Sequence, residues 1–111
     1  MQKTEEIASD VKHIHHRPSI EIIIGVVANF FKINDSDLIK SQRGKENIPR
    51  LIAIYLSRQM DLYTYTQIGT SFNSRMYAIN SSLKRFRKIL DQNLELNANL
   101  NRIKQKIYEN V

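Results

Sequence analysis

The sequence predicts an all-α fold, a compact bundle of about five to six helices, on three observations. Apolar residues recur every three or four positions in several segments, which is the spacing of one face of an α-helix. Residues that commonly cap helices precede those segments. The chain has 111 residues, 41% of them hydrophobic and 25% charged, which suffices for one buried core but not for two.

Residues 1–18 are expected to form a short N-terminal arm or helix. Apolar residues at helical spacing run from Ile7 to Ile14, and a polar stretch that ends at Pro18 then interrupts the pattern. Residues 19–111 are expected to form a single domain.

The first helix of that domain is predicted from Ser19 to Lys32, with Ser19 as its N-cap. The β-branched run IEIIIGVV also permits a strand. The helix is favoured because apolar residues continue at helical spacing through Phe30 and Phe31. A short turn follows and ends near Ile39.

A second long helix is predicted from Ile48 to Met60. Asn47 suits its N-cap, and Pro49 suits its first turn, where a missing N–H costs no helical hydrogen bond. The residues expected to face inward are Ile52, Tyr55, Leu56 and Met60.

The segment from Thr64 to Leu83 has the spacing of a helix-turn-helix motif. Thr64 and Gln67 form a capping box that opens a short helix. The motif then needs a small residue, a residue that tolerates positive φ four positions later, and an aliphatic residue six positions after that. These residues are Gly69, Asn73 and Ile79. A helical hairpin can also show this spacing by chance.

The helix after the turn is predicted from Arg75 to Leu90 and has two contrasting faces. At 100° per residue, its apolar and presumed core face comprises Met76, Ile79, Leu83, Phe86 and Leu90. The opposite face comprises Tyr77, Ser81, Lys84 and Lys88, flanked by Asn80 and Arg85. A polar and basic face of this kind suits contacts with base edges in its first turns and with phosphates further along. The alternative is an ordinary solvated helix face.

A last helix is predicted from an apolar repeat with spacings of 4, 3 and 4, formed by Leu96, Leu100, Ile103 and Ile107. It can pack back on the domain or pair with a partner. Asparagines interrupt a clean heptad, which favours intramolecular packing and a monomer. A helical protein-interaction module is the alternative.

Positive charge is concentrated in the centre of the chain. The net charge is +6, and residues 41–90 hold nine basic but only two acidic residues. A localised basic field favours double-stranded DNA as a partner, because neutralised phosphates release counterions. The loop 41–47, SQRGKEN, can lie along the backbone or enter an adjacent minor groove, or it is an exposed loop with incidental charge. The residues predicted to contact DNA are Arg43, Lys45, Arg50, Thr64, Arg75, Tyr77, Asn80, Ser81, Lys84, Arg85 and Lys88.

The stretch from Ile22 to Leu90 resembles the C-terminal DNA-binding domain of the bacterial replication initiator DnaA, and the DnaA-like domain of some REP-associated tyrosine transposases. The segments that carry the resemblance are VVANFFKINDSDLI, RGKENIPRLIAIYLSR and YTQIGTSF. It implies a Trp-repressor-like helical fold that binds duplex DNA through its helix-turn-helix and the preceding basic loop. By this match, Arg43 or Lys45 occupies the loop position that probes the minor groove.

The resemblance fails at the start of the recognition helix. DnaA proteins have an Asp-His-Thr-Thr-Val signature there, whereas this chain has the residues 75–79, RMYAI, in a segment one residue shorter. The shorter form is more similar to the transposase-associated version. We therefore expect the fold and DNA binding to carry over, and the DnaA-box specificity not to. Replication initiation, transcriptional control and transposon-end recognition all remain open.

The sequence argues against an enzyme, a cofactor and a membrane. It has no cysteine and no phosphate-binding glycine loop, so we expect neither a cysteine-ligated metal nor the ATPase module of DnaA, and no small-molecule substrate. No apolar run reaches the length of a membrane span and the first residues lack the order of a secretory signal, so a cytoplasmic protein is expected. His13 and His15 match the metal-binding pattern of rolling-circle nucleases, but the chain has no room for the sheet that such sites need.

Overall fold

A computed structural model of the protein describes residues 18–41, 46–61 and 63–110, and all regular structure in them is helical. The six helices are α2 (Ile20–Phe31), α3 (Asp35–Ile39), α4 (Ile48–Asp61), α5 (Tyr65–Ser71), α6 (Met76–Asp91) and α7 (Leu94–Glu109). The predicted all-α fold is confirmed. The arm expected over residues 1–18 lies, apart from Pro18, outside the described residues.

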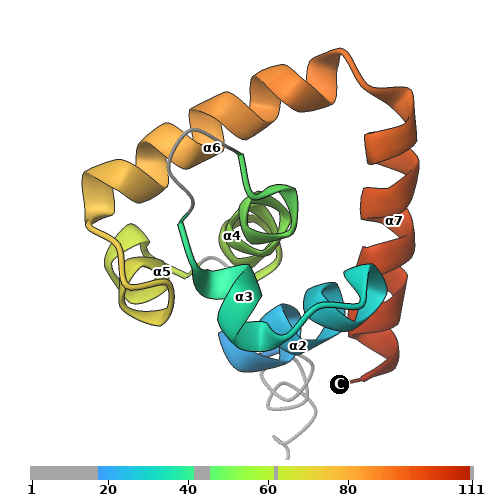
Figure 1. The fold of residues 1–111 in the computed structure, drawn as a ribbon, viewed down its shortest axis with the longest axis horizontal. Coiled ribbons are helices and arrows are strands. Elements are labelled where there is room, and N and C mark those ends of the chain that lie inside the picture. The colour runs from blue at the N-terminus through green and yellow to red at the C-terminus, as the bar shows by residue number, and fades with distance from the viewer. Residues whose placement is uncertain (1–17, 42–45, 62, 111) are drawn as a thin grey trace, which may run out of the picture.

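The helix α4 is the centre of the fold, with α2, α3, α5 and α6 packed around it (Figure 1). Its middle is buried on nearly every side, and five side chains there are at most 2% exposed: Leu51, Ile52, Ala53, Ile54 and Leu56. Our expectation of a single inward face was therefore too narrow, because a helix enclosed by neighbours is apolar all round. Tyr55 is half-buried and lies against Phe86 of α6, with 5.0 Å between the ring centroids.

The helix α2 forms where the sequence predicts it, and the strand alternative is wrong. The Ser19 hydroxyl accepts a hydrogen bond from the backbone N–H of Ile22 at 3.1 Å, which caps the helix. Lys32 ends it in the left-handed conformation, with φ 58°. Ile23 and Val27 are fully buried against the core.

The predicted turn between α5 and α6 is present in detail. Thr64 and Gln67 form the reciprocal capping box of α5. Asn73 has a φ of 53°, in the left-handed region that asparagine tolerates. Next to it, the N–H of Ser74 donates to the carbonyl of Gly69 at 2.8 Å. A Cβ atom at Gly69 would overlap the carbonyl oxygen of Ser74, so only glycine fits this close approach.

The helices α6 and α7 form the long edges of the bundle (Figure 1). Ile79, Leu83 and Phe86 of α6 are buried, as predicted. Met76 was predicted to be core and is not: it is 57% exposed and lines the open corner between α5 and α6. The helix α7 buries its predicted apolar repeat against α2 and α6 of the same chain.

The turn chemistry generates a prediction for Gly69. Gly69→Ala should lower the free energy of unfolding by about 2 kcal/mol, because the new methyl group meets a backbone carbonyl that cannot move without opening the turn. Urea unfolding followed by circular dichroism measures the change. Gly25→Ala is the matched control: a Cβ at this helical glycine meets nothing within 4 Å, so the variant should gain up to about 1 kcal/mol. Equal effects at both glycines would contradict the prediction.

Candidate nucleic-acid interface

The outward face of α6 is polar and basic, as the sequence predicts. Tyr77, Ser81, Lys84 and Lys88 are all exposed, and they follow one another at spacings of four, three and four residues along one side of the helix. Asn80 is half-buried beside them. The buried residues Ile79, Leu83 and Phe86 hold the opposite side against the core, which fixes the direction in which this face points.

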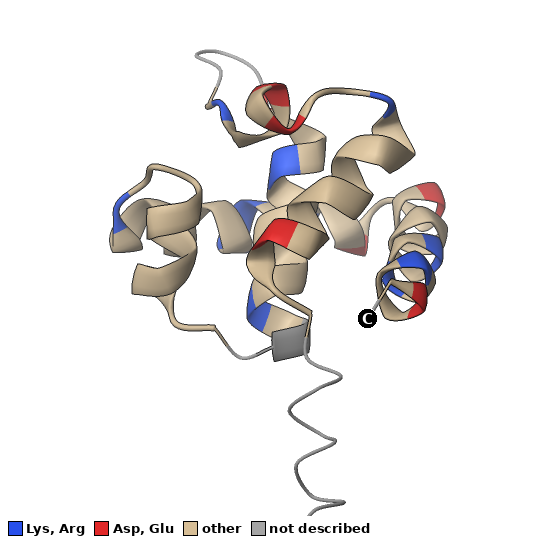
Figure 2. Ribbon diagram, turned by 90° about the horizontal axis from the view of Figure 1, so that it is seen from below, with Lys and Arg blue, Asp and Glu red and all other residues tan. Residues whose placement is uncertain are grey.

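The charge on α6 differs in kind from that on α7. Between Met76 and Asp91 the sequence has four basic residues and a single acid, at the very end of the helix. On α7 an acidic residue stands near each end, with three basic residues between them (Figure 2). The basic field predicted from residues 41–90 is thus carried on the surface in part by α6.

The basic loop is closed at its base by Asn47. Residues 42–45, and with them Arg43 and Lys45, lie outside the described residues. On the N-terminal side of the loop, the Nδ2 of Asn47 donates to the carbonyls of Asp37, Leu38 and Lys40, at 3.1, 3.2 and 2.9 Å. The Oδ1 of Asn47 accepts from the N–H of Arg50 at 3.3 Å, which is the predicted cap of α4. One side chain therefore joins the two ends of the loop.

Arg85 ties the loop to α6. Its Nε donates to the Oε2 of Glu46 at 2.9 Å, and its Nη2 donates to the hydroxyl of Ser82 at 3.3 Å. Both charged side chains are more than 40% exposed, so the pair contributes little to stability. Its effect is geometric, because it holds Glu46, near the end of the loop, against the side of α6. Arg85 was predicted to contact DNA, and the structure gives it this protein partner.

Arg50 is an interior residue, which corrects its prediction as a surface contact to DNA. It is 7% exposed. Its Nε donates to the carbonyl of Ile39 at 2.9 Å, its Nη2 donates to the carbonyl of Phe72 at 3.4 Å, and its guanidinium carbon lies 5.8 Å from the Phe72 ring centre. Burial, and then the nearby charge of Arg85, lower the pKa of Arg50 from its ordinary value. The sequence shows the charge of Arg50 but not the two carbonyl groups that hold its side chain in the interior.

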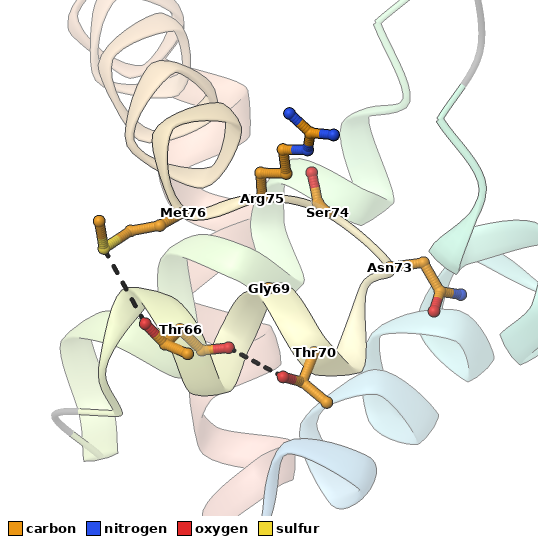
Figure 3. Close-up of a pocket in the computed structure, with 7 residues that line it drawn as sticks. All are labelled: Thr66, Gly69, Thr70, Asn73, Ser74, Arg75 and Met76. Carbon is orange, nitrogen blue, oxygen red and sulfur yellow. Dashed lines mark hydrogen bonds between the residues drawn. The ribbon is translucent and has the colours of Figure 1, made fainter.

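Thr64 and Arg75 are both exposed, at the starts of α5 and α6. The Thr64 hydroxyl accepts from the N–H of Gln67 at 3.1 Å as part of the capping box. Arg75 occupies the N-cap position of α6 without a side-chain capping bond, and its guanidinium extends away from α5 (Figure 3).

An open hollow of about 590 Å³ lies in the corner between α5 and α6. The residues that line it are Thr66, Gly69, Thr70, Asn73, Ser74, Arg75 and Met76. Across it, the hydroxyl of Thr66 donates to the sulfur of Met76 at 3.9 Å, so the two side chains point toward one another (Figure 3). Neither was predicted as a site residue. The capping box marks where α5 begins and could have drawn attention to Thr66, but no sequence signal marks Met76 as exposed.

The described part of the chain offers neither of two other kinds of site. Its acidic side chains form no group of three that could hold a metal ion. None of its helices combines the length and the apolar character needed to cross a membrane. The residues His13 and His15, which carry the nuclease alternative, fall outside the described ranges.

Comparison with known proteins agrees with this geometry. The family described as "Bacterial dnaA protein helix-turn-helix" matches residues 20–81. The chromosomal replication initiator protein DnaA of Geotalea daltonii is 34% identical over 91 residues, which is 80% of this chain and 20% of the relative. The same protein of Ehrlichia ruminantium is 31% identical over 104 residues, covering 91% and 22%, and that of Treponema pallidum is 31% identical over 102 residues, covering 90% and 21%. The chain thus spans about a fifth of the length of these relatives.

Asn47 has two roles, because its Nδ2 holds the carbonyls at the end of α3 and its Oδ1 caps α4, and one substitution separates them. Asn47→Asp keeps an oxygen to cap α4 but sets a carboxylate against three carbonyls, so the free energy of unfolding should fall by about 2 kcal/mol. The control is Asn93→Asp. Asn93 caps α7 by accepting from the N–H of Leu96, a bond that aspartate also makes, so this variant should stay within about 0.5 kcal/mol of the parent. Urea unfolding of both variants measures the difference. Equal stability of the two variants would show that the bonds from Asn47 to the three carbonyls contribute nothing to stability.

Arg50 generates a second prediction. Arg50→Ala leaves two buried carbonyls without a donor and should lower the free energy of unfolding by about 3 kcal/mol. Arg50→Lys should recover only part of this loss, because an ammonium group cannot span both carbonyls. Arg102→Ala, at an exposed position on α7, should change stability by less than about 0.5 kcal/mol. Thermal and urea unfolding measure all three variants, and an Arg50→Ala protein as stable as the control would show that the buried contacts are unimportant.

Proposed function

Since this chain belongs to the bacterial DnaA helix-turn-helix family, we propose that it binds double-stranded DNA sequence-specifically through α6 and the basic loop 41–47. The observation that carries the proposal is the exposed face of α6, where polar and basic side chains stand opposite the buried residues Ile79, Leu83 and Phe86. A helix presented in this way after a helix-turn-helix corner fits the major groove. In this proposal the DNA-binding unit comprises residues 19–111.

The residues of α6 divide their work along the helix. Arg75, Tyr77, Asn80 and Ser81, in its first turns, contact base edges. Lys84 and Lys88 lie one and two turns further along the same face, where long cationic side chains reach phosphates. Thr64, which is exposed at the start of α5, contacts the sugar-phosphate backbone of the DNA beside the major groove.

The basic loop contacts DNA next to the segment read by α6. Arg43 and Lys45 belong to a loop whose two ends are joined by Asn47 and whose Glu46 is paired with Arg85 of α6. We propose that one of these two basic residues enters the neighbouring minor groove, where a narrow groove concentrates negative potential. Arg85 acts mainly by positioning the loop, and its remaining N–H groups are available to a phosphate.

The biological setting follows from the relatives. These relatives are chromosomal replication initiators, so we propose that the chain serves as the DNA-binding part of a DnaA-type initiator, as a cytoplasmic monomer associated with the chromosome. It acts by binding and performs no catalysis of its own. The second candidate is the end-binding domain of a REP-type transposase. The sequence RMYAI at the start of α6, in place of the DnaA signature, is the observation that favours it.

The proposal predicts how salt and lysine variants affect binding. Selection from a random duplex library provides the preferred site, and fluorescence anisotropy measures its affinity over a range of salt concentrations. Lys84→Ala and Lys88→Ala should each weaken binding to all duplexes alike and reduce the slope of log affinity against log salt by about one. Lys106→Ala, which removes an exposed lysine of α7, should leave affinity and slope unchanged.

Two outcomes would contradict the proposal. The first is the absence of binding to any duplex at low salt. The second is an equal loss of affinity in Lys84→Ala and Lys106→Ala, which would assign binding to net charge rather than to α6. Selection of a DnaA-type box would favour the initiator, and selection of a hairpin-flanking transposon end would favour the transposase.

A further inference from the structure

Two large apolar side chains stand exposed at the start of α6. Met76 is 57% exposed and Tyr77 is 67% exposed, although they follow one another directly. The residues beyond them on the outward face are polar or basic, namely Ser81, Lys84 and Lys88. The start of α6 is therefore apolar at its surface, whereas the rest of its outward face is polar or basic, and the apolar end is the one next to the helix-turn-helix corner.

Met76 is held in this position from the neighbouring helix. The hydroxyl of Thr66 on α5 donates to its sulfur at 3.9 Å, across the hollow at the corner (Figure 3). Thioether sulfur is a weak acceptor, so this contact orients the side chain more than it stabilises the fold. The hydrophobic core does not cover Met76, because the buried part of the apolar face of α6 begins at Ile79.

The chemistry of DNA limits what such an apolar pair can contact. Along the major groove, the base edges present hydrogen-bond donors and acceptors and one apolar group, the C5 methyl of thymine. A surface that presents a thioether and a phenol ring at the groove, beside four basic residues of the same helix, matches that methyl group.

We propose that Met76 and Tyr77 form a specificity element that reads thymine methyl groups, so that the preferred site has A·T pairs where the first turn of α6 meets it. This inference rests on the proposed function, because it requires α6 to lie in the major groove. Thr66 is a positioning residue for Met76. The preference comes from burial of the methyl group, which is worth about fourfold in affinity for each methyl removed from water.

The test replaces thymine by uracil, which has the same hydrogen-bonding edge without the methyl group. The probe is the duplex selected from the random library by the parent protein, with each thymine in turn changed to uracil and affinity measured by anisotropy. One or two positions should each lose about fourfold in affinity with the parent protein. In Met76→Ala or Tyr77→Ala that loss should shrink to less than about twofold at the same positions, which links the methyl group to the side chain. Thr66→Val, which removes the donor to Met76, should also reduce the effect at the position assigned to Met76.

Conservative variants serve as controls. Tyr77→Phe and Met76→Leu keep an apolar surface, so both should retain the uracil effect, whereas a role for the Tyr77 hydroxyl would show as a loss in Tyr77→Phe. Unfolding curves of all variants should match the parent, because both side chains are exposed.

Each failure has a separate meaning. If the parent protein selects and binds a duplex but uracil equals thymine at every position, the methyl-reading inference is overturned while the proposed function stands. The inference is also overturned, and the proposed function stands, if the uracil effect is undiminished in Met76→Ala and Tyr77→Ala. It is likewise overturned if both variants bind DNA like the parent, a result that would favour a protein partner for the two exposed side chains. If the parent binds no duplex at all, the proposed function itself fails.

Discussion

The approach of Gly69 to Ser74 is the constraint on which the interface depends. The bond from the Ser74 N–H to the Gly69 carbonyl, with Asn73 in the left-handed conformation between them, sets where α6 begins and how it crosses α5. A side chain at Gly69 would push the turn away from α5 and rotate every outward residue of α6. The direction of the recognition face is thus decided by backbone geometry, before any side chain on it is chosen.

Polar joints then connect the parts that packing alone would leave independent. Asn47 joins the end of α3 to the start of α4, and Arg50 joins both to the carbonyl of Phe72 at the end of α5. Arg85 and Glu46 extend the same connection outward to α6. Together they relate the basic loop to the helix-turn-helix through hydrogen bonds of four side chains, three of which are charged, and one of these, Arg50, is buried.

The sequence predicted the helices well because their apolar spacing and capping residues are local signals. Thr64, Gln67 and Asn73 behave as their neighbours along the chain imply. The failures concern tertiary surroundings. Arg50 is basic but is held in the interior by carbonyl groups 11 and 22 residues away along the chain. Met76 lies at the edge of the apolar face of α6, where the core does not cover it. The sequence likewise did not predict that neighbouring helices surround α4, because hydrophobic periodicity identifies only one buried face of a helix.

The enclosure of α4 has a consequence for how function is lost. A helix surrounded by α2, α3, α5 and α6 exposes its amide groups to solvent only when the bundle opens, so its amides will exchange hydrogen last and report global unfolding. The α5–α6 unit rests on that helix and has no separate core. Random mutagenesis will therefore yield binding-deficient proteins mostly through α4, by reducing the folded population, at positions far from any contact with DNA.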